Sequence, residues 1–152
     1  MDWILPEPML AAAVESAVLP AKTAAEPKWD GYRALLARYG DGRVVIRSRR
    51  GTDMTAAFPE IAASAAALPV DVGLDGELIV WENGRLAFER LQGRLNRTAA
   101  ATADLVAKWP AHFVAFDLLH QGSTDLRAGP TPIAAPRWRA CSRTTTWGRR
   151  WC

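Results

Sequence analysis

The sequence predicts a single α+β domain built on an antiparallel sheet, and three observations support this fold class. Short strand-like runs are separated by glycine turns such as Gly40-Asp41-Gly42 and Asn83-Gly84, which are typical of hairpin loops. Alanine-rich helical stretches lie between these runs and end at prolines. The length of 152 residues, with 49% hydrophobic and 23% charged residues, is that of one globular domain with a core.

The first half of the chain predicts an extended segment and a set of hairpin strands. Residues 1–22 contain three prolines, which disfavour a long helix and favour an extended lead-in packed on the domain. Strands are expected at 23–28, 32–39 and 43–48, with the first turn at Trp29-Asp30-Gly31. A helix over 52–68, capped by Asp53 or Thr55, is expected to end at Pro69 and to bury one apolar side.

The second half predicts two more strand regions separated by short helices. Strands are expected at 72–81, 85–88 and 112–119, and helices at 88–95 and 101–108, the last ending before Pro110. Gly76 stands between two acids inside a strand, which suggests that a ligand approaches the backbone closely there.

Lys28 is the candidate nucleophile of this chain. A lysine amine reacts only after losing its proton, and at its ordinary pKa it is almost fully protonated at neutral pH. Burial, Arg33 or a bound metal would lower that pKa, whereas Asp30 and Glu26 would favour the charged form. The alternative is a solvated lysine at the end of a surface strand.

Several segments, in order along the chain, resemble one family. Glu26-Pro27-Lys28-Trp29-Asp30-Gly31-Tyr32-Arg33 resembles the first motif of the ATP-dependent DNA ligases, which belong to the nucleotidyltransferase superfamily together with RNA ligases and mRNA capping enzymes. Ser48-Arg49-Arg50-Gly51, Asp75-Gly76-Glu77-Leu78 and Phe113 to Leu119 resemble later motifs of the same family. The Phe-x-x-Leu-Gln-x-Arg pattern at 88–94 is also similar to these ligases.

The resemblance implies a fold and a reaction. The fold would be the antiparallel-sheet, ATP-grasp-like adenylation domain of the nucleotidyltransferases. Lys28 would attack the α-phosphorus of ATP in the presence of Mg²⁺, hold AMP as a phosphoramidate, and pass it to the 5′ phosphate of nicked double-stranded DNA during repair or recombination.

The resemblance also assigns the other site residues. Arg49 would contact a phosphate, Glu77 a ribose hydroxyl, and the Phe116 ring would stack on adenine. From the residues alone, Arg47 or Arg50 remains an alternative to Arg49, Asp75 an alternative to Glu77, and Phe116 a possible core residue. The complete set of expected nucleotide-binding positions is Glu26, Asp30, Arg33, Arg49, Glu77 and Phe116, with Lys28 as the catalytic residue.

The resemblance covers about residues 20–127 and then stops. We expect a lead-in at 1–22, a partial adenylation domain at 23–127 lacking the C-terminal oligonucleotide-binding (OB) fold, and an atypical tail at 128–152. The family's metal-binding glutamate and its two later lysines have no counterpart after Arg127. The tail's arginine, tryptophan and proline content resembles a GC-rich gene read in a shifted frame, so we hypothesise a truncated copy with weak or no activity.

Charge and composition limit the remaining possibilities. Six of the 19 lysines and arginines and none of the 16 acids lie after Asp125, so the first 125 residues carry a net charge of −3. The basic pI therefore gives no support to a cationic DNA-binding face on the main domain. Two cysteines and two histidines without metal-ligand spacing predict no metal site, and the absence of a long apolar run predicts a cytoplasmic protein without a membrane span.

Two other functions stay open at the level of sequence. An RNA ligase or capping-type nucleotidyltransferase would share the lysine motif. A non-catalytic nucleic-acid-binding fragment would use the arginines and tryptophans of the tail. For all of these functions we expect the protein to be a monomer.

Overall fold

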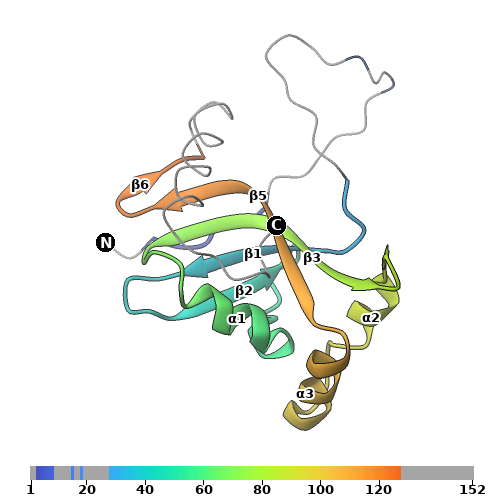
Figure 1. The fold of residues 1–152 in the computed structure, drawn as a ribbon. Coiled ribbons are helices and arrows are strands. Elements are labelled where there is room, and N and C mark those ends of the chain that lie inside the picture. Colours follow the sequence, from blue (N-terminus) through green and yellow to red (C-terminus); the bar gives the residue numbers. More distant parts are fainter. Residues whose placement is uncertain (1–2, 9–14, 16–17, 19–27, 128–152) are drawn as a thin grey trace.

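The computed structural model describes residues 3–8, 15, 18 and 28–127 (Figure 1). Within them the chain forms a six-stranded antiparallel sheet with helices between strands, which confirms the predicted α+β class. The strands are β1 Tyr32–Arg38, β2 Val44–Ser48, β3 Val72–Glu82, β4 Arg85–Leu86, β5 Ala111–Gln121 and β6 Thr124–Asp125. The helices are the 3₁₀ turn η1 Thr55–Ala57, α1 Pro59–Ala65, α2 Phe88–Gln92 and α3 Ala99–Lys108.

The strand order is β2-β1-β3-β5-β6, and β4 pairs with the far end of β3. The central strands β3 and β5 are each 11 residues long and are paired with register shifts between Gly73 and Leu74 and between Asp75 and Gly76. Such irregularities bend a strand and redirect its side chains. The acids of the Asp-Gly-Glu segment therefore stand at the most irregular part of the sheet.

One face of the sheet carries the main core. Figure 1 shows α1 and α2 on the same side of the strands, and the buried side chains there include Phe58, Ile61, Leu74, Leu78 and Phe113. Alternation along β1 sends Ala34 and Leu36 into this core and Arg33 and Leu35 to the opposite face. The two faces of β1 thus have separate roles.

The opposite face is partly covered by the lead-in. Leu5 is buried with Leu35 and Leu119, and the Trp3 ring stacks on His120 with centroids 4.3 Å apart. A Cβ at position 73 would lie 2.7 Å from the Trp3 ring, so only glycine fits beneath it. Residues 3–8 are therefore anchored on the sheet by packing.

The helix predicted over 52–68 is divided and shorter than expected. Asp53 accepts a hydrogen bond from the Thr55 amide (2.8 Å), as a cap would, but the turn that follows is η1. Phe58 is non-helical (φ −130°, ψ 59°) because the ring of a following proline disfavours the α conformation, and α1 begins at Pro59. The helix ends at Ala65, although Leu68 is buried as predicted.

The remaining predictions of local structure are close to the observed elements. β1, β2, β3, α3 and β5 lie within three residues of their predicted bounds, whereas β4 and α2 are shorter and β6 was not predicted. The strand expected at 23–28 lies outside the described residues except for Lys28, which is in no strand.

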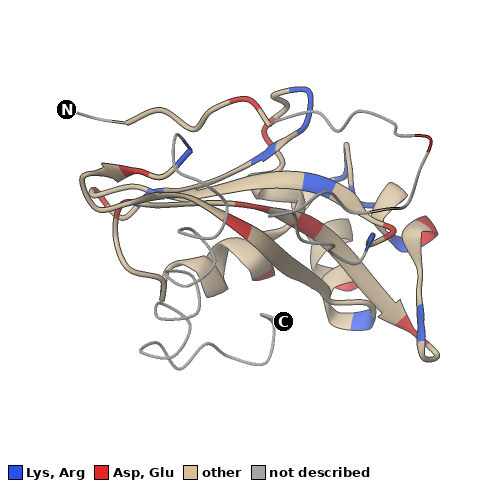
Figure 2. Cartoon of the chain, turned by 90° about the horizontal axis from the view of Figure 1, so that it is seen from above, with Lys and Arg blue, Asp and Glu red and all other residues tan. Residues whose placement is uncertain are grey.

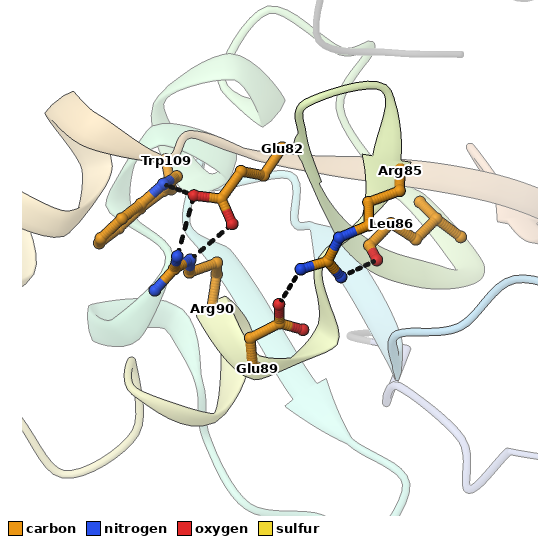
Figure 3. Close-up of polar contacts among 6 residues, drawn as sticks. All are labelled: Glu82, Arg85, Leu86, Glu89, Arg90 and Trp109. Atoms are coloured by element: carbon orange, nitrogen blue, oxygen red, sulfur yellow. Dashed lines mark hydrogen bonds and ion pairs between the residues drawn. The ribbon is translucent and has the colours of Figure 1, made fainter.

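Two groups of ion pairs join the helices to the sheet. Arg94 of the Phe-x-x-Leu-Gln-x-Arg pattern is buried and bonds the Glu60 carboxylate at 2.6 Å. Near the end of β3, Glu82 accepts two hydrogen bonds from Arg90 (2.9 and 3.0 Å) and one from the Trp109 indole (2.8 Å), as Figure 3 shows. These bonds, above all those from Arg90, lower the pKa of Glu82.

No helix in the described part of the chain is long and apolar enough to cross a membrane.

Candidate functional site

A groove of about 880 Å³ lies where the first residues of β1, the turn after β2 and the middle of β3 meet. This volume lies within the range of small-molecule sites. Its lining brings together three of the sequence motifs, with Arg33, Arg49 and Glu77 as their representatives. The full lining is Glu7, Pro8, Gly31, Tyr32, Arg33, Ser48, Arg49, Arg50, Thr52, Met54, Glu77 and Leu95.

Strand pairing explains why these motifs meet. Ala34 pairs with Ser48 and Arg33 pairs with Glu77, so residues far apart in sequence share one edge of the groove. Arg49 and Arg50 follow β2 in an exposed turn, where guanidinium groups are free to reach a phosphate. Arg33 on β1 lies beside the acids of β3, and Figure 2 shows basic and acidic segments on the strands of the sheet.

Arg33 is held by Asp75 rather than by the residue directly opposite it. Its Nε donates to Asp75 Oδ1 at 3.1 Å and its Nη2 donates to Oδ2 at 2.7 Å. These hydrogen bonds raise the pKa of Arg33, and the Asp75 side chain is only 5% exposed. The Arg33 guanidinium also lies 5.5 Å from the centre of the Phe116 ring.

Glu77 stands in a different electrostatic environment. Burial raises its pKa to about 7 against the lowering effect of Arg33, and Asp75 and Asp30 raise it further. A hydrogen bond from the Gly31 amide favours the charged form. Burial likewise raises the pKa of Asp117, which pairs with Asp75 across β3 and β5.

Gly31 is required by the close approach of the chain to β3. A Cβ at this position would lie 2.1 Å from the Leu78 carbonyl oxygen and 2.9 Å from Glu77 Cγ. The Asp30-Gly31 turn is therefore pressed against the strand that carries the Asp-Gly-Glu segment.

The remaining predicted residues lie around this groove. Lys28 and Asp30 are exposed and directly precede Gly31, whereas Glu26 lies outside the described residues. Phe116 is partly buried on β5 and is linked to the groove through Arg33. The structure therefore gathers Arg33, Arg49 and Glu77, with Phe116 next to Arg33 and Lys28 at the entrance to β1.

Two features of the groove were not found from the sequence. Asp75 was considered only as an alternative to Glu77, and its bond to Arg33 depends on pairing between distant strands. Glu7 and Pro8 of the lead-in line the groove and also lie beside Arg49 and Arg50 in a neighbouring cavity. Asp75 and Glu77 are two residues apart on one strand, and this spacing indicated that both side chains face the same side of the sheet.

The described residues contain no group of three or more histidines, cysteines or acids placed to hold a metal ion.

A profile of the ATP dependent DNA ligase domain matches residues 8–133. The chain belongs to this family. DNA ligase C2 of Mycolicibacterium smegmatis and DNA ligase C of Mycobacterium tuberculosis are each 41% identical to it over 124 residues, which are 81% of this chain and 34% of the relative. This ligase-family chain thus spans about a third of the length of these curated relatives.

Solved structures support the same assignment. A mycobacterial DNA ligase D complexed with ATP and MES superposes with a TM-score of 0.65 at 31% identity, over 80% of this chain and 37% of that one. The ligase domain of M. tuberculosis LigD gives a TM-score of 0.63 at 31% identity, over 78% of this chain and 36% of that domain. The nucleotidyltransferase fold implied by the resemblance is confirmed.

The comparisons extend further along the chain than the motifs did. The profile reaches residue 133, and the alignment with DNA ligase C1 of M. smegmatis, at 37% identity, covers 96% of this chain. That alignment includes most of residues 128–152, which lie outside the described residues. The domain boundaries and the shifted-frame origin of the tail stay predictions.

Proposed function

We propose that this chain is part of an ATP-dependent DNA ligase and that its groove binds ATP for adenylation of Lys28. The proposal rests on one observation: Arg33, Arg49 and Glu77 line the same groove, and the first residues of that lining on β1 follow Lys28 closely in the sequence. The ATP bound in a related mycobacterial ligase D supports the choice of nucleotide.

The chemistry of the groove suits a nucleotide. Arg49 and Arg50 supply permanent positive charge for phosphates. Glu77, when ionised, is an acceptor for ribose hydroxyl groups, and the Phe116 ring offers a face for adenine. With Mg²⁺ on the phosphates, charge neutralisation and positioning would provide most of the catalysis.

The proposed step is a displacement at phosphorus. The neutral Nζ of Lys28 attacks the α-phosphorus and forms an N–P bond, while the bond from that phosphorus to the bridging oxygen breaks. Pyrophosphate leaves with the electron pair, and the proton of the amine passes to solvent. The resulting lysyl-AMP would then donate AMP to the 5′ phosphate of nicked duplex DNA, for which the family's other conserved groups would be needed.

The test is labelling of the purified chain with α-labelled ATP and Mg²⁺. We expect label that survives denaturation in the native chain and is absent from Lys28→Ala. Lys108→Ala is the matched control, because Lys108 is also exposed but lies at the end of α3. Equal labelling of the two variants would refute the role of Lys28.

The same assay separates the nearest alternative. A capping-type enzyme would transfer GMP, so labelling by GTP in place of ATP would overturn the ligase proposal. A folded chain labelled by neither nucleotide would mean that its relationship to the ligases is one of ancestry, in line with the weak or absent activity predicted from the sequence.

A further inference from the structure

We propose that Arg33 and Asp75 are positioning residues, whose ion pair fixes the Arg33 side chain in the groove lining beside Phe116 and keeps it from forming an ion pair with Glu77, so that the Glu77 carboxylate is left for the ligand. The ligand part of this inference rests on the proposed function, whereas the part that concerns Glu77 alone does not. Neither residue is required to touch the nucleotide.

The strand register shows that this pairing is selective. Arg33 lies directly opposite Glu77, and side chains directly opposite in an antiparallel pair are the nearest cross-strand neighbours. Its guanidinium nevertheless donates two hydrogen bonds to Asp75, which is opposite Leu35. The guanidinium therefore leans along β3 away from the acid that faces it.

Burial explains the choice. Asp75 is 4% exposed, and a buried carboxylate without a cation is costly, so the two-bond pair with Arg33 satisfies it. Glu77 is more open to the groove and receives only the Gly31 amide bond among its described partners. Arg33 therefore pairs with Asp75, the acid that solvent and ligand cannot reach.

Glu77 forms no ion pair with any residue in the described part of the chain. Arg33 faces it from β1, Asp75 lies two residues away on β3, Asp30 lies in the preceding turn, and Val114 opposite it on β5 is apolar. Arg49 and Arg50 line the same groove on the β2 side without forming an ion pair with it. Its pKa of about 7 is consistent with this arrangement.

The Phe116 ring depends on the same guanidinium. Arg33 lies 5.5 Å from the ring centre, within the range of a cation–π contact. Because two bonds to Asp75 hold the guanidinium in place, the ring rests against a fixed partner. Loss of Asp75 would free both Arg33 and the surface that supports Phe116.

The experiment is the variant Asp75→Asn, read by the ¹³C carboxyl shift of Glu77 during an NMR pH titration without nucleotide. Asparagine keeps the shape but not the charge, so Arg33 is expected to turn to Glu77 and lower its titration midpoint by about one pH unit or more. Loss of the Asp75 charge by itself also lowers this midpoint, and the difference between Arg33→Met and the double variant Arg33→Met with Asp75→Asn measures that contribution. A fall in Asp75→Asn no larger than this difference would overturn the turning of Arg33. A midpoint that stays where it is in the native chain overturns the proposal. Asp104→Asn, an exposed acid on α3, is the matched control and should leave the midpoint unchanged.

A second measurement uses the native chain, so it does not depend on a variant that folds. The ¹⁵Nε signals of arginine are followed while ATP and MgCl₂ are added. The signal of Arg33 should stay in place because its bond to Asp75 persists, while that of Arg49 should move. Movement of Arg33 with ATP would make it a ligand contact and overturn its positioning role.

The two measurements separate this inference from the proposed function. If no arginine signal responds to ATP, the nucleotide proposal fails. The titration midpoint of Glu77 in Asp75→Asn still tests whether the ion pair with Asp75 keeps Arg33 from pairing with Glu77. If Asp75→Asn does shift that midpoint, ATP affinity should fall several-fold in the same variant, because Glu77 is then engaged by Arg33. Unchanged affinity would overturn the ligand part alone.

Discussion

Replacing Arg94 by methionine should be among the most destabilising single changes in the described part of this chain. The Arg94 side chain is fully buried and the Glu60 side chain is 4% exposed, with 2.6 Å between Nη1 and Oε1. Arg94 also donates to the Trp109 carbonyl and lies 5.4 Å from the centre of the Phe58 ring. One guanidinium thus joins α1, the segment after α2 and the start of β5.

The magnitude follows from the charge that would be left behind. Breaking a buried ion pair by removing one partner costs about 3–5 kcal/mol, because the other charge stays buried and unpaired. The Ala111 amide would still donate to Glu60 at 2.9 Å, and methionine would refill most of the volume, so we expect no larger loss. Against the ~5–15 kcal/mol stability of an ordinary domain, this is a large fraction.

The assay is urea unfolding followed by tryptophan fluorescence. With an m-value of about 2 kcal/mol/M, the midpoint of Arg94→Met should fall by roughly 2 M. Arg97→Met is the matched control, because Arg97 is exposed and its Nε bonds only the Gly93 carbonyl, so its effect should stay within about 0.5 kcal/mol.

Two results would refute this reasoning. The first is a loss below about 1 kcal/mol for Arg94→Met, which would mean that Glu60 is not left as a costly buried charge. The second concerns the double variant Glu60→Leu with Arg94→Met, which removes both charges and should recover much of the lost stability. A double variant no more stable than Arg94→Met would show that packing, and not charge, is responsible.

Two further predictions concern the groove. Gly31→Ala should cost about 1–3 kcal/mol of stability and reduce Lys28 labelling, because its Cβ would meet the Leu78 carbonyl oxygen at 2.1 Å. Urea unfolding and the labelling assay measure the two effects. Gly93→Ala is the control and should be close to neutral in both assays, because the nearest atom to its Cβ would be 3.9 Å away. Because the pKa of Glu77 is raised from 4.5 to about 7, the folded chain binds more protons than the unfolded chain between these values, so stability should decline as pH rises from about 4.5 to 7. Glu77 is partly exposed, so solvent screening limits this decline to the order of 1 kcal/mol. Urea midpoints across this range should show the decline in the native chain and a flatter profile in Glu77→Gln; identical profiles would contradict the assignment.

Local patterns predicted most of the secondary structure. The glycine turn at 40–42 placed β1 and β2, and the prolines at 69 and 110 closed the helical regions that precede β3 and β5. The one large error, the undivided helix over 52–68, came from giving helical periodicity more weight than Pro59, which excludes Phe58 from the helix.

The site was predicted residue by residue, but not as an arrangement. The motifs indicated Arg33, Arg49, Glu77 and Phe116, and pairing of β1 with β2 and β3 brings the first three into one groove. Nothing in the local pattern indicated that Arg94 of the Phe-x-x-Leu-Gln-x-Arg pattern would bond Glu60, 34 residues earlier.

Most strands, their turns and the family could be predicted from the sequence, because these depend on neighbouring residues and on the order of short motifs. Which acid receives Arg33, and which is left open to the groove, depends on the folded arrangement of the strands. Asp75 and Glu77 are two residues apart on the same strand and chemically alike, and they differ in burial and in cross-strand partners. Burial exists only after distant strands have paired, and it explains why Arg33 bonds Asp75 although the register sets Arg33 opposite Glu77.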